Sequence, residues 1–155
     1  HLLIDAGAFF LLYAQIEEKR FARRFVYMTG SLVGSMFAAA IVMPALTSVG
    51  YCGLSGIAHG LMAVSSIEMI IGAKGDKARR NAGLISFGLL ATKSIYEAVT
   101  GNFFLGFLHP DLLGAPVLLS HMGGMLGGCA AYAIVNTAKL KKQICNRSLM
   151  ALQAA

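Results

Sequence analysis

The chain has 155 residues, of which 57% are hydrophobic and only 13% are charged, and its mean hydropathy is +0.68. Soluble domains carry roughly 25% charged residues, so this composition excludes an ordinary soluble domain. The net charge of +6 lies in three short basic clusters between apolar runs, a pattern typical of membrane-protein loops rather than of a nucleic-acid-binding face. We therefore expect one domain, a lipid bilayer around it and no nucleic-acid partner.

The first predicted helix runs from about Leu2 to Ile16 and precedes the basic segment EEKRFARR. The second runs from Phe25 to about Met43, where Pro44 ends it, and an uncharged loop follows. A membrane-spanning helix needs about 20 predominantly apolar residues. The second helix meets this length, whereas the first is short and the chain opens without a methionine, so we expect that its beginning is missing.

Three further apolar segments are near the length that crosses a bilayer. They cover residues 53–72, 82–100 and 115–137. The sequence thus predicts an all-α fold, a polytopic membrane helical bundle with five spans. We assign residues 1–138 to the transmembrane domain and residues 139–155 to a basic cytoplasmic tail.

The basic residues predict which loops are cytoplasmic. Of the 13 Lys and Arg residues, all except Lys93 lie in the first loop, the third loop or the tail. Positive residues favour the cytoplasmic side, and this assignment alternates correctly across five spans. It places His1, Ser55 and His121 toward the outer side of the membrane.

The cysteines do not predict a metal site. Cys52, Cys129 and Cys145 are odd in number and share no metal-ligand spacing. We expect free thiols, no metal and no cofactor.

A serine and a histidine from distant spans are expected at similar depth. Ser55 enters the third span at its outer end, and His121 lies roughly 9 Å below the outer end of the fifth, at 1.5 Å per residue. A serine hydroxyl becomes a strong nucleophile when a neighbouring base takes its proton, and the amides of a helix start can bind an oxyanion. Asp5 and Glu97 are expected in the same outer layer.

Small residues predict close contact between these two spans. His121, Gly124 and Gly128 share one helix face, while Gly56 and Gly60 give the third span a matching small-residue pattern. The segment GSLVG, residues 30–34, also indicates a helix contact. Packing alone is an alternative interpretation of GLSG, because small residues are common where membrane helices meet. GLSG also differs from the Gly-x-Ser-x-Gly elbow of soluble hydrolases, since Ile57 occupies the last glycine position.

Other polar groups leave further alternatives open. His59 lies one turn after Ser55 and competes with His121 as its base, since a histidine within a span is a functional candidate. Lys93 and Glu97 are four residues apart and predict an ion pair, and Glu68 is expected to reach the inner interface. A small transporter using these three charges is an alternative, although no inverted repeat or broken helix is evident.

The motifs GLSG at residues 53–56 and HMGGMLGG at residues 121–128 resemble those of the rhomboid intramembrane serine proteases. HLLID occupies the place of the rhomboid His-x-x-x-Asn element, and EEKRFARRF resembles the basic loop that follows it. The finer resemblance is to the rhombosortase branch, through GLSG followed by x-x-HG and through KxxYExxTG at residues 93–101. It spans His1 to about Ala138.

The resemblance implies a six-helix rhomboid core whose first helix is absent from this chain. It implies Ser55 as nucleophile and His121 as general base, a dyad without a required carboxylate, with His1 and the backbone amides of Leu54 and Ser55 in the oxyanion hole. Gly56 would support the same turn. Asp5 stands where rhomboids have asparagine, and His59 where many place an aromatic residue against the catalytic histidine. We expect Glu97 to orient a histidine.

The resemblance also implies a substrate and a location. Rhomboids cut single-span membrane proteins near the outer face, and rhombosortases are associated with C-terminal Gly-Gly tails of exported bacterial proteins. The expected location is the bacterial inner membrane, with the active site toward the periplasm and a membrane-anchored protein as the partner. The alternative is a non-catalytic rhomboid-like protein that binds membrane helices.

Overall fold

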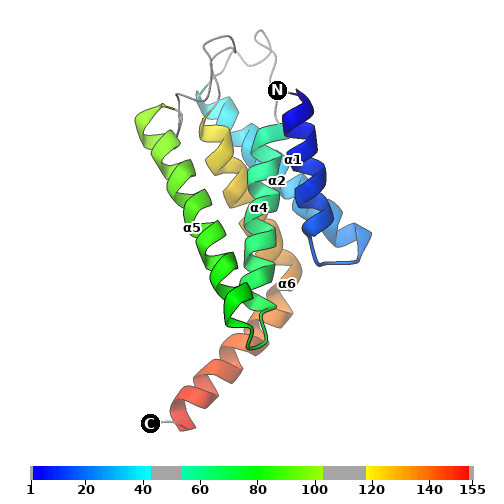
Figure 1. The fold of residues 1–155 in the computed structure, drawn as a ribbon, viewed down its shortest axis with the longest axis vertical. Coiled ribbons are helices and arrows are strands. Elements are labelled where there is room, and N and C mark those ends of the chain that lie inside the picture. Colours follow the sequence, from blue (N-terminus) through cyan, green and yellow to red (C-terminus); the bar gives the residue numbers. More distant parts are fainter. Residues whose placement is uncertain (1, 43–53, 103–117, 154–155) are drawn as a thin grey trace.

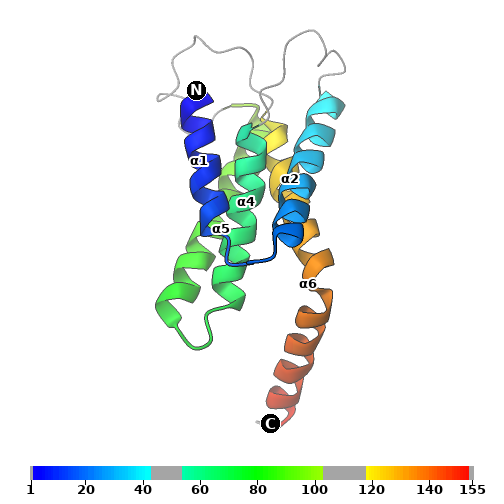
Figure 2. The same cartoon turned by 90° about the vertical axis from the view of Figure 1, so that its right-hand side faces the viewer.

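The computed structural model describes residues 2–42, 54–102 and 118–153, with side chains for residues 6–41, 54–102 and 118–137. Every regular element in these residues is an α-helix, which confirms the all-α fold class. The helices are α1 (Leu2–Gln15), α2 (Phe21–Val42), α4 (Leu54–Ile71), α5 (Lys77–Thr100) and α6 (Leu119–Gln153). Figures 1 and 2 show one elongated bundle in which α4 is central and packs against the other four.

Two helices begin earlier than hydropathy predicted. α2 starts at Phe21 instead of Phe25, and the Arg24 guanidinium folds back over the Tyr13 ring, 4.0 Å from its centroid. α5 starts at Lys77 instead of Ala82, because the Asp76 side chain caps it by accepting from the Arg79 backbone N–H at 3.0 Å. Both starts were predicted too late because the first turns of these helices contain charged residues, which a prediction from hydropathy leaves out.

The last helix does not end where its apolar segment ends. α6 continues to Gln153, and the change of direction falls at Asn136, whose backbone angles are non-helical (φ −110°, ψ 15°). The Asn136 amide donates to the Tyr27 hydroxyl at 2.8 Å and to the Tyr132 carbonyl at 3.1 Å. The basic tail is therefore helical beyond this kink and extends away from the bundle (Figures 1 and 2).

Two helices are long and apolar enough to cross a membrane, over Phe21–Ile41 and Leu54–Ile71. Only 28% and 44% of these windows is buried inside the protein, unlike the core helix of a soluble domain. Among the described residues a shorter apolar helix covers Ala6–Gln15, and α5 and α6 do not meet the same criterion. Membrane association is thus indicated by two of the five expected spans.

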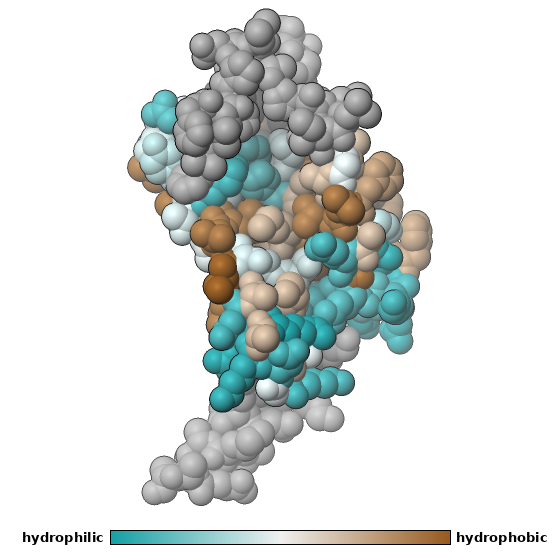
Figure 3. Space-filling model, viewed as in Figure 1, coloured by the Kyte–Doolittle hydropathy of each residue, from teal (hydrophilic) through white to brown (hydrophobic). Residues whose placement is uncertain are grey.

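The bundle has an apolar core that also contains polar side chains, and many of its large apolar side chains are exposed. The buried polar side chains include Glu68, Glu97, His121 and Asn136, and Ser31, Ser35 and Ser94 have no exposed surface. Large apolar side chains face outward instead, with Phe37 69% and Val99 79% exposed. In Figure 3 hydrophobic residues gather along the middle of the bundle and hydrophilic ones nearer the end from which α6 extends. Such a surface suits an apolar surrounding better than water.

The helices α4 and α6 touch through glycines. A side chain on Gly124 would collide with the backbone carbonyl of Gly56, and one on Gly128 would lie 2.5 Å from the carbonyl oxygen of Gly60. The structure therefore brings these four glycines together at the contact that the sequence predicted between the third and fifth spans. Because the backbones approach this closely, short side chains at the helix ends can meet.

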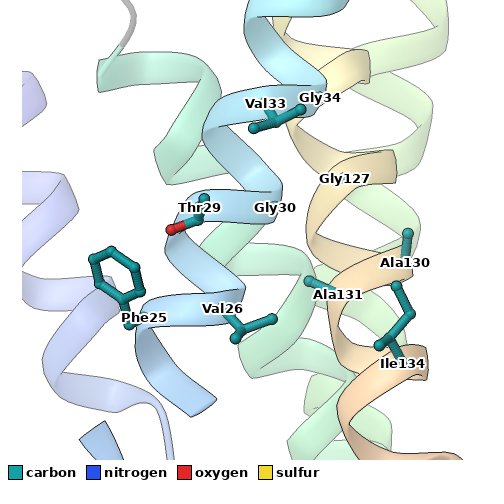
Figure 4. Close-up of a pocket in the computed structure, with 10 residues that line it drawn as sticks. All are labelled: Phe25, Val26, Thr29, Gly30, Val33, Gly34, Gly127, Ala130, Ala131 and Ile134. Carbon is teal, nitrogen blue, oxygen red and sulfur yellow. The ribbon is translucent and has the colours of Figure 1, made fainter. Parts of the chain in front are cut away.

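A second glycine contact joins α2 to α6. Figure 4 shows Gly30 and Gly34 beside Gly127, and a side chain on any of the three would meet the opposite backbone. An apolar groove of about 460 Å³ follows this contact, with Val33 and Ile134 among the residues that line it. None of its lining residues is Ser55 or His121, so the groove is separate from the polar group described below.

Gly124→Ala is expected to destabilise the protein by about 1–3 kcal/mol, because the Gly56 backbone cannot move aside as a flexible side chain can. The matched control is Gly88→Ala on α5, where nothing lies within 4 Å of the new methyl group. The control should be neutral or slightly stabilising, because alanine favours a helix over glycine. Thermal unfolding in detergent measures both, and equal melting temperatures would contradict the close packing.

Glu68 lies in the last turn of α4, near the end of the bundle at which the sequence placed it. It is 8% exposed, and its Oε2 accepts the Glu17 backbone N–H at 2.6 Å. Glu17 in turn forms an ion pair with Arg79. The α1–α2 connection and the α4–α5 turn therefore meet at one end of the bundle. The basic residues predicted that these two loops lie on the same side. Glu68 lies apart from the polar group at the other end.

Candidate active site

Ser55 and His121 lie at the starts of two neighbouring helices. Ser55 is the second residue of α4 and His121 the third of α6, so His121 is in the first turn rather than deeper in its helix. The Ser55 Oγ is 3.2 Å from the His121 Nε2. This distance lies at the long end of the range for a nucleophile and its base. The glycine contact below them sets this approach.

Glu97 holds the opposite nitrogen of the same imidazole. Its Oε2 lies 2.7 Å from the His121 Nδ1, and its residue is 1% exposed. A carboxylate can only accept, so the proton must be on Nδ1 and the His121 Nε2 is left to accept from the serine hydroxyl. Ser55, His121 and Glu97 thus form a continuous hydrogen-bonded relay, which sequence reasoning anticipated only as an orienting role for Glu97.

Lys93 connects this relay to the second histidine. Its ammonium lies 2.8 Å from both Glu97 oxygens, 3.1 Å from the His59 Nε2 and 3.5 Å from the His121 Nδ1. The expected Lys93–Glu97 pair is present, but the contacts with the histidines were not foreseen. The available signal was that Lys93 is the one basic residue outside the three clusters.

His59 has both ring nitrogens engaged away from the serine hydroxyl. Because an ammonium only donates, the His59 Nε2 accepts from Lys93, and its Nδ1 carries the proton donated to the Ser55 carbonyl at 2.7 Å. The ring stacks on His121 with centroids 4.1 Å apart and planes at 4°. His59 therefore packs against the candidate base, and His121 is the histidine that faces the Ser55 Oγ.

The start of α4 supplies backbone donors beside Ser55. The helix begins at Leu54, and the first amides of a helix have no acceptor within it. Gly56, in the same turn, is buried, and a side chain there would collide with Ser35. His1 lies outside the described residues. Asp5 belongs to α1, but its side chain is outside the described part.

Comparison of the chain with protein-family models, with curated proteins and with solved structures found no match in any of the three.

The same cluster contains a donor set of the kind that binds metal ions. One ligand atom each from His59, Glu97 and His121 lies within 4.8 Å of the others. The Lys93 ammonium contacts an atom of each of these three residues. Among the thiols with described side chains, Cys129 is free; Cys52 and the side chain of Cys145 lie outside the described part.

Proposed function

We propose that this chain is an intramembrane serine endopeptidase of the rhomboid type, and within it of the rhombosortase branch. The observation that carries the proposal is the relay from Ser55 through His121 to Glu97, with distances of 3.2 and 2.7 Å. A serine, a histidine and a carboxylate in this order are the parts of a hydrolytic triad, which is recognised by geometry rather than by position in the sequence.

The proposed reaction follows from the protons in this relay. The Ser55 Oγ attacks the scissile carbonyl while the His121 Nε2 takes its proton, and Glu97 stabilises the imidazolium that forms. First-turn amides of α4 donate to the oxyanion. His121 then protonates the leaving amine, which departs as the acyl-enzyme forms. Water, deprotonated by His121, hydrolyses that ester and restores the serine.

The surface of the bundle supports a membrane setting for this chemistry. Apolar side chains on α2 and α5 face outward, while His121 and Glu97 are buried and Ser55 is partly exposed. Ser55 lies at the bundle end opposite the basic turns. We propose five spans in the bacterial inner membrane, with the relay on the periplasmic side. The resemblance in GLSG, HMGGMLGG and KxxYExxTG supports a C-terminal Gly-Gly tail of an exported protein as the substrate.

A fluorophosphonate probe tests the proposal without knowledge of the natural substrate. Such a probe esterifies an activated serine, so we expect it to modify the purified chain in detergent, and peptide mass mapping to place the adduct on Ser55. Denaturing the protein before adding the probe is the control, because the relay is then lost. Labelling that survives denaturation, or that maps to another serine, would contradict an active serine at this position.

A further inference from the structure

The Lys93 ammonium lies among ligand-type atoms from three helices. It contacts the His59 Nε2 of α4, both carboxylate oxygens of Glu97 and, at 3.5 Å, the His121 Nδ1 of α6. Two imidazoles and a carboxylate around one cation are the donors that zinc takes in proteins. With zinc bonds of about 2.0–2.2 Å, tetrahedral ligand atoms lie roughly 3–3.5 Å apart. Here they lie within 4.8 Å, so small side-chain rotations would suffice.

We propose that Lys93 is the resident cation of a metal-type site formed by His59, Glu97 and His121, and that it keeps divalent metal ions out of the site. The existence of this donor set is argued from the distances alone. Its role in catalysis rests on the proposed function, in which Lys93 is a positioning residue that touches no reacting atom. It holds the carboxylate of Glu97 near His121 and the ring of His59 against it.

The charges explain why a cation belongs there. Glu97 is 1% exposed, and a carboxylate removed from water is costly unless a positive group compensates it. Lys93 supplies one positive charge from the preceding turn of the same helix, so the carboxylate and the ammonium together are neutral. Removing the ammonium leaves the buried negative charge and two imidazoles as an unfilled site for a cation.

The protons explain why a metal ion must be excluded. A metal on the His121 Nδ1 would take the lone pair of that nitrogen, so a neutral ring would carry its proton on Nε2 instead. Nε2 would then donate to the Ser55 Oγ and accept nothing from it. Zinc in this site would therefore block the base, whereas the Lys93 ammonium leaves Nδ1–H paired with Glu97.

The test is zinc uptake by the purified full chain in detergent, without a histidine tag. Wild type, Lys93→Ala and Lys93→Met are dialysed against micromolar zinc chloride, and bound zinc is counted by mass spectrometry. We expect wild type to bind none at this site and both variants to retain about one zinc per chain. The matched control is the double variant Lys93→Ala/His59→Ala, which lacks one ligand and should lose that zinc. Helix content by circular dichroism identifies variants that have not folded.

Two results would overturn the proposal. One is zinc retained by wild type as well as by Lys93→Ala, which would mean that the ammonium excludes nothing. The other is a folded Lys93→Met that takes up no zinc. Zinc uptake requires no turnover, so it remains informative even if Ser55 proves unreactive. If the proposed function also holds, zinc should inhibit the residual cleavage by Lys93→Ala, chelation should reverse this, and wild type should be unaffected.

Discussion

Ser55→Ala is expected to lower the rate of cleavage of a Gly-Gly tail reporter by about 10⁴-fold or more, because nothing else in the relay can form the acyl-enzyme. His121→Ala should cause a loss of similar size, since the serine proton then has no acceptor at 3.2 Å. The two effects are not expected to add, because the residues act as one unit. The measurement is cleavage of the reporter in cells and in detergent, at matched protein levels.

Ser65→Ala is the matched control for the serine variant. Ser65 is also buried on α4, but it lies more than two turns from Ser55 along the helix. Its replacement should leave both cleavage and fluorophosphonate labelling of Ser55 unchanged. Cleavage by Ser55→Ala at a rate close to wild type would exclude the serine mechanism. Tail binding without turnover by the wild-type protein would instead favour the non-catalytic membrane-helix binder.

Glu97→Gln is expected to reduce kcat by about 10²–10⁴-fold with little change in KM. Glutamine keeps the size of the side chain but removes the charge that stabilises the His121 imidazolium. Its amide can also present N–H groups to Nδ1, which favours the tautomer whose Nε2 cannot accept the serine proton. Steady-state kinetics with the tail reporter measures the effect. Glu97→Asp retains the charge at a greater distance and should fall between wild type and Glu97→Gln.

Glu68→Gln is the control for losing a buried carboxylate. Glu68 is 8% exposed and accepts from Glu17 at the other end of the bundle, so its replacement should leave kcat unchanged. If Glu97→Gln kept its kcat and lost only thermal stability, Glu97 would be a structural partner of Lys93 rather than part of the relay.

The helices could be predicted from the sequence because a long apolar run has few stable structures other than a helix. Helices were expected near every segment described here, and the ends near Gln15, Ile71 and Thr100 fall within one or two residues of prediction. The starts of α2 and α5 and the end of α6 were wrong, since caps and backbone hydrogen bonds, not hydropathy, decide where a helix begins and ends.

The pairing of Ser55 with His121 was expected from depth and from the glycine pattern. Their positions along helices of known rise predicted similar levels, and the glycines predicted a close approach. His121 was preferred to His59 as the base because a second helix can aim its imidazole across the gap, although both residues are compatible with the level of Ser55. In the structure, the His59 ring contacts Lys93 and the Ser55 carbonyl, whereas the His121 Nε2 contacts the Ser55 Oγ.

The sequence by itself determined an apolar helical chain whose basic residues mark one side, because composition and the 3.6-residue period depend only on neighbours in the chain. Only the tertiary structure placed the Lys93 ammonium among Glu97, His59 and His121. The local sequence pattern does not determine how α4, α5 and α6 are rotated about their axes relative to one another. The glycine contacts bring the backbones of α4 and α6 together, and the packing of α5 against them completes one connected site.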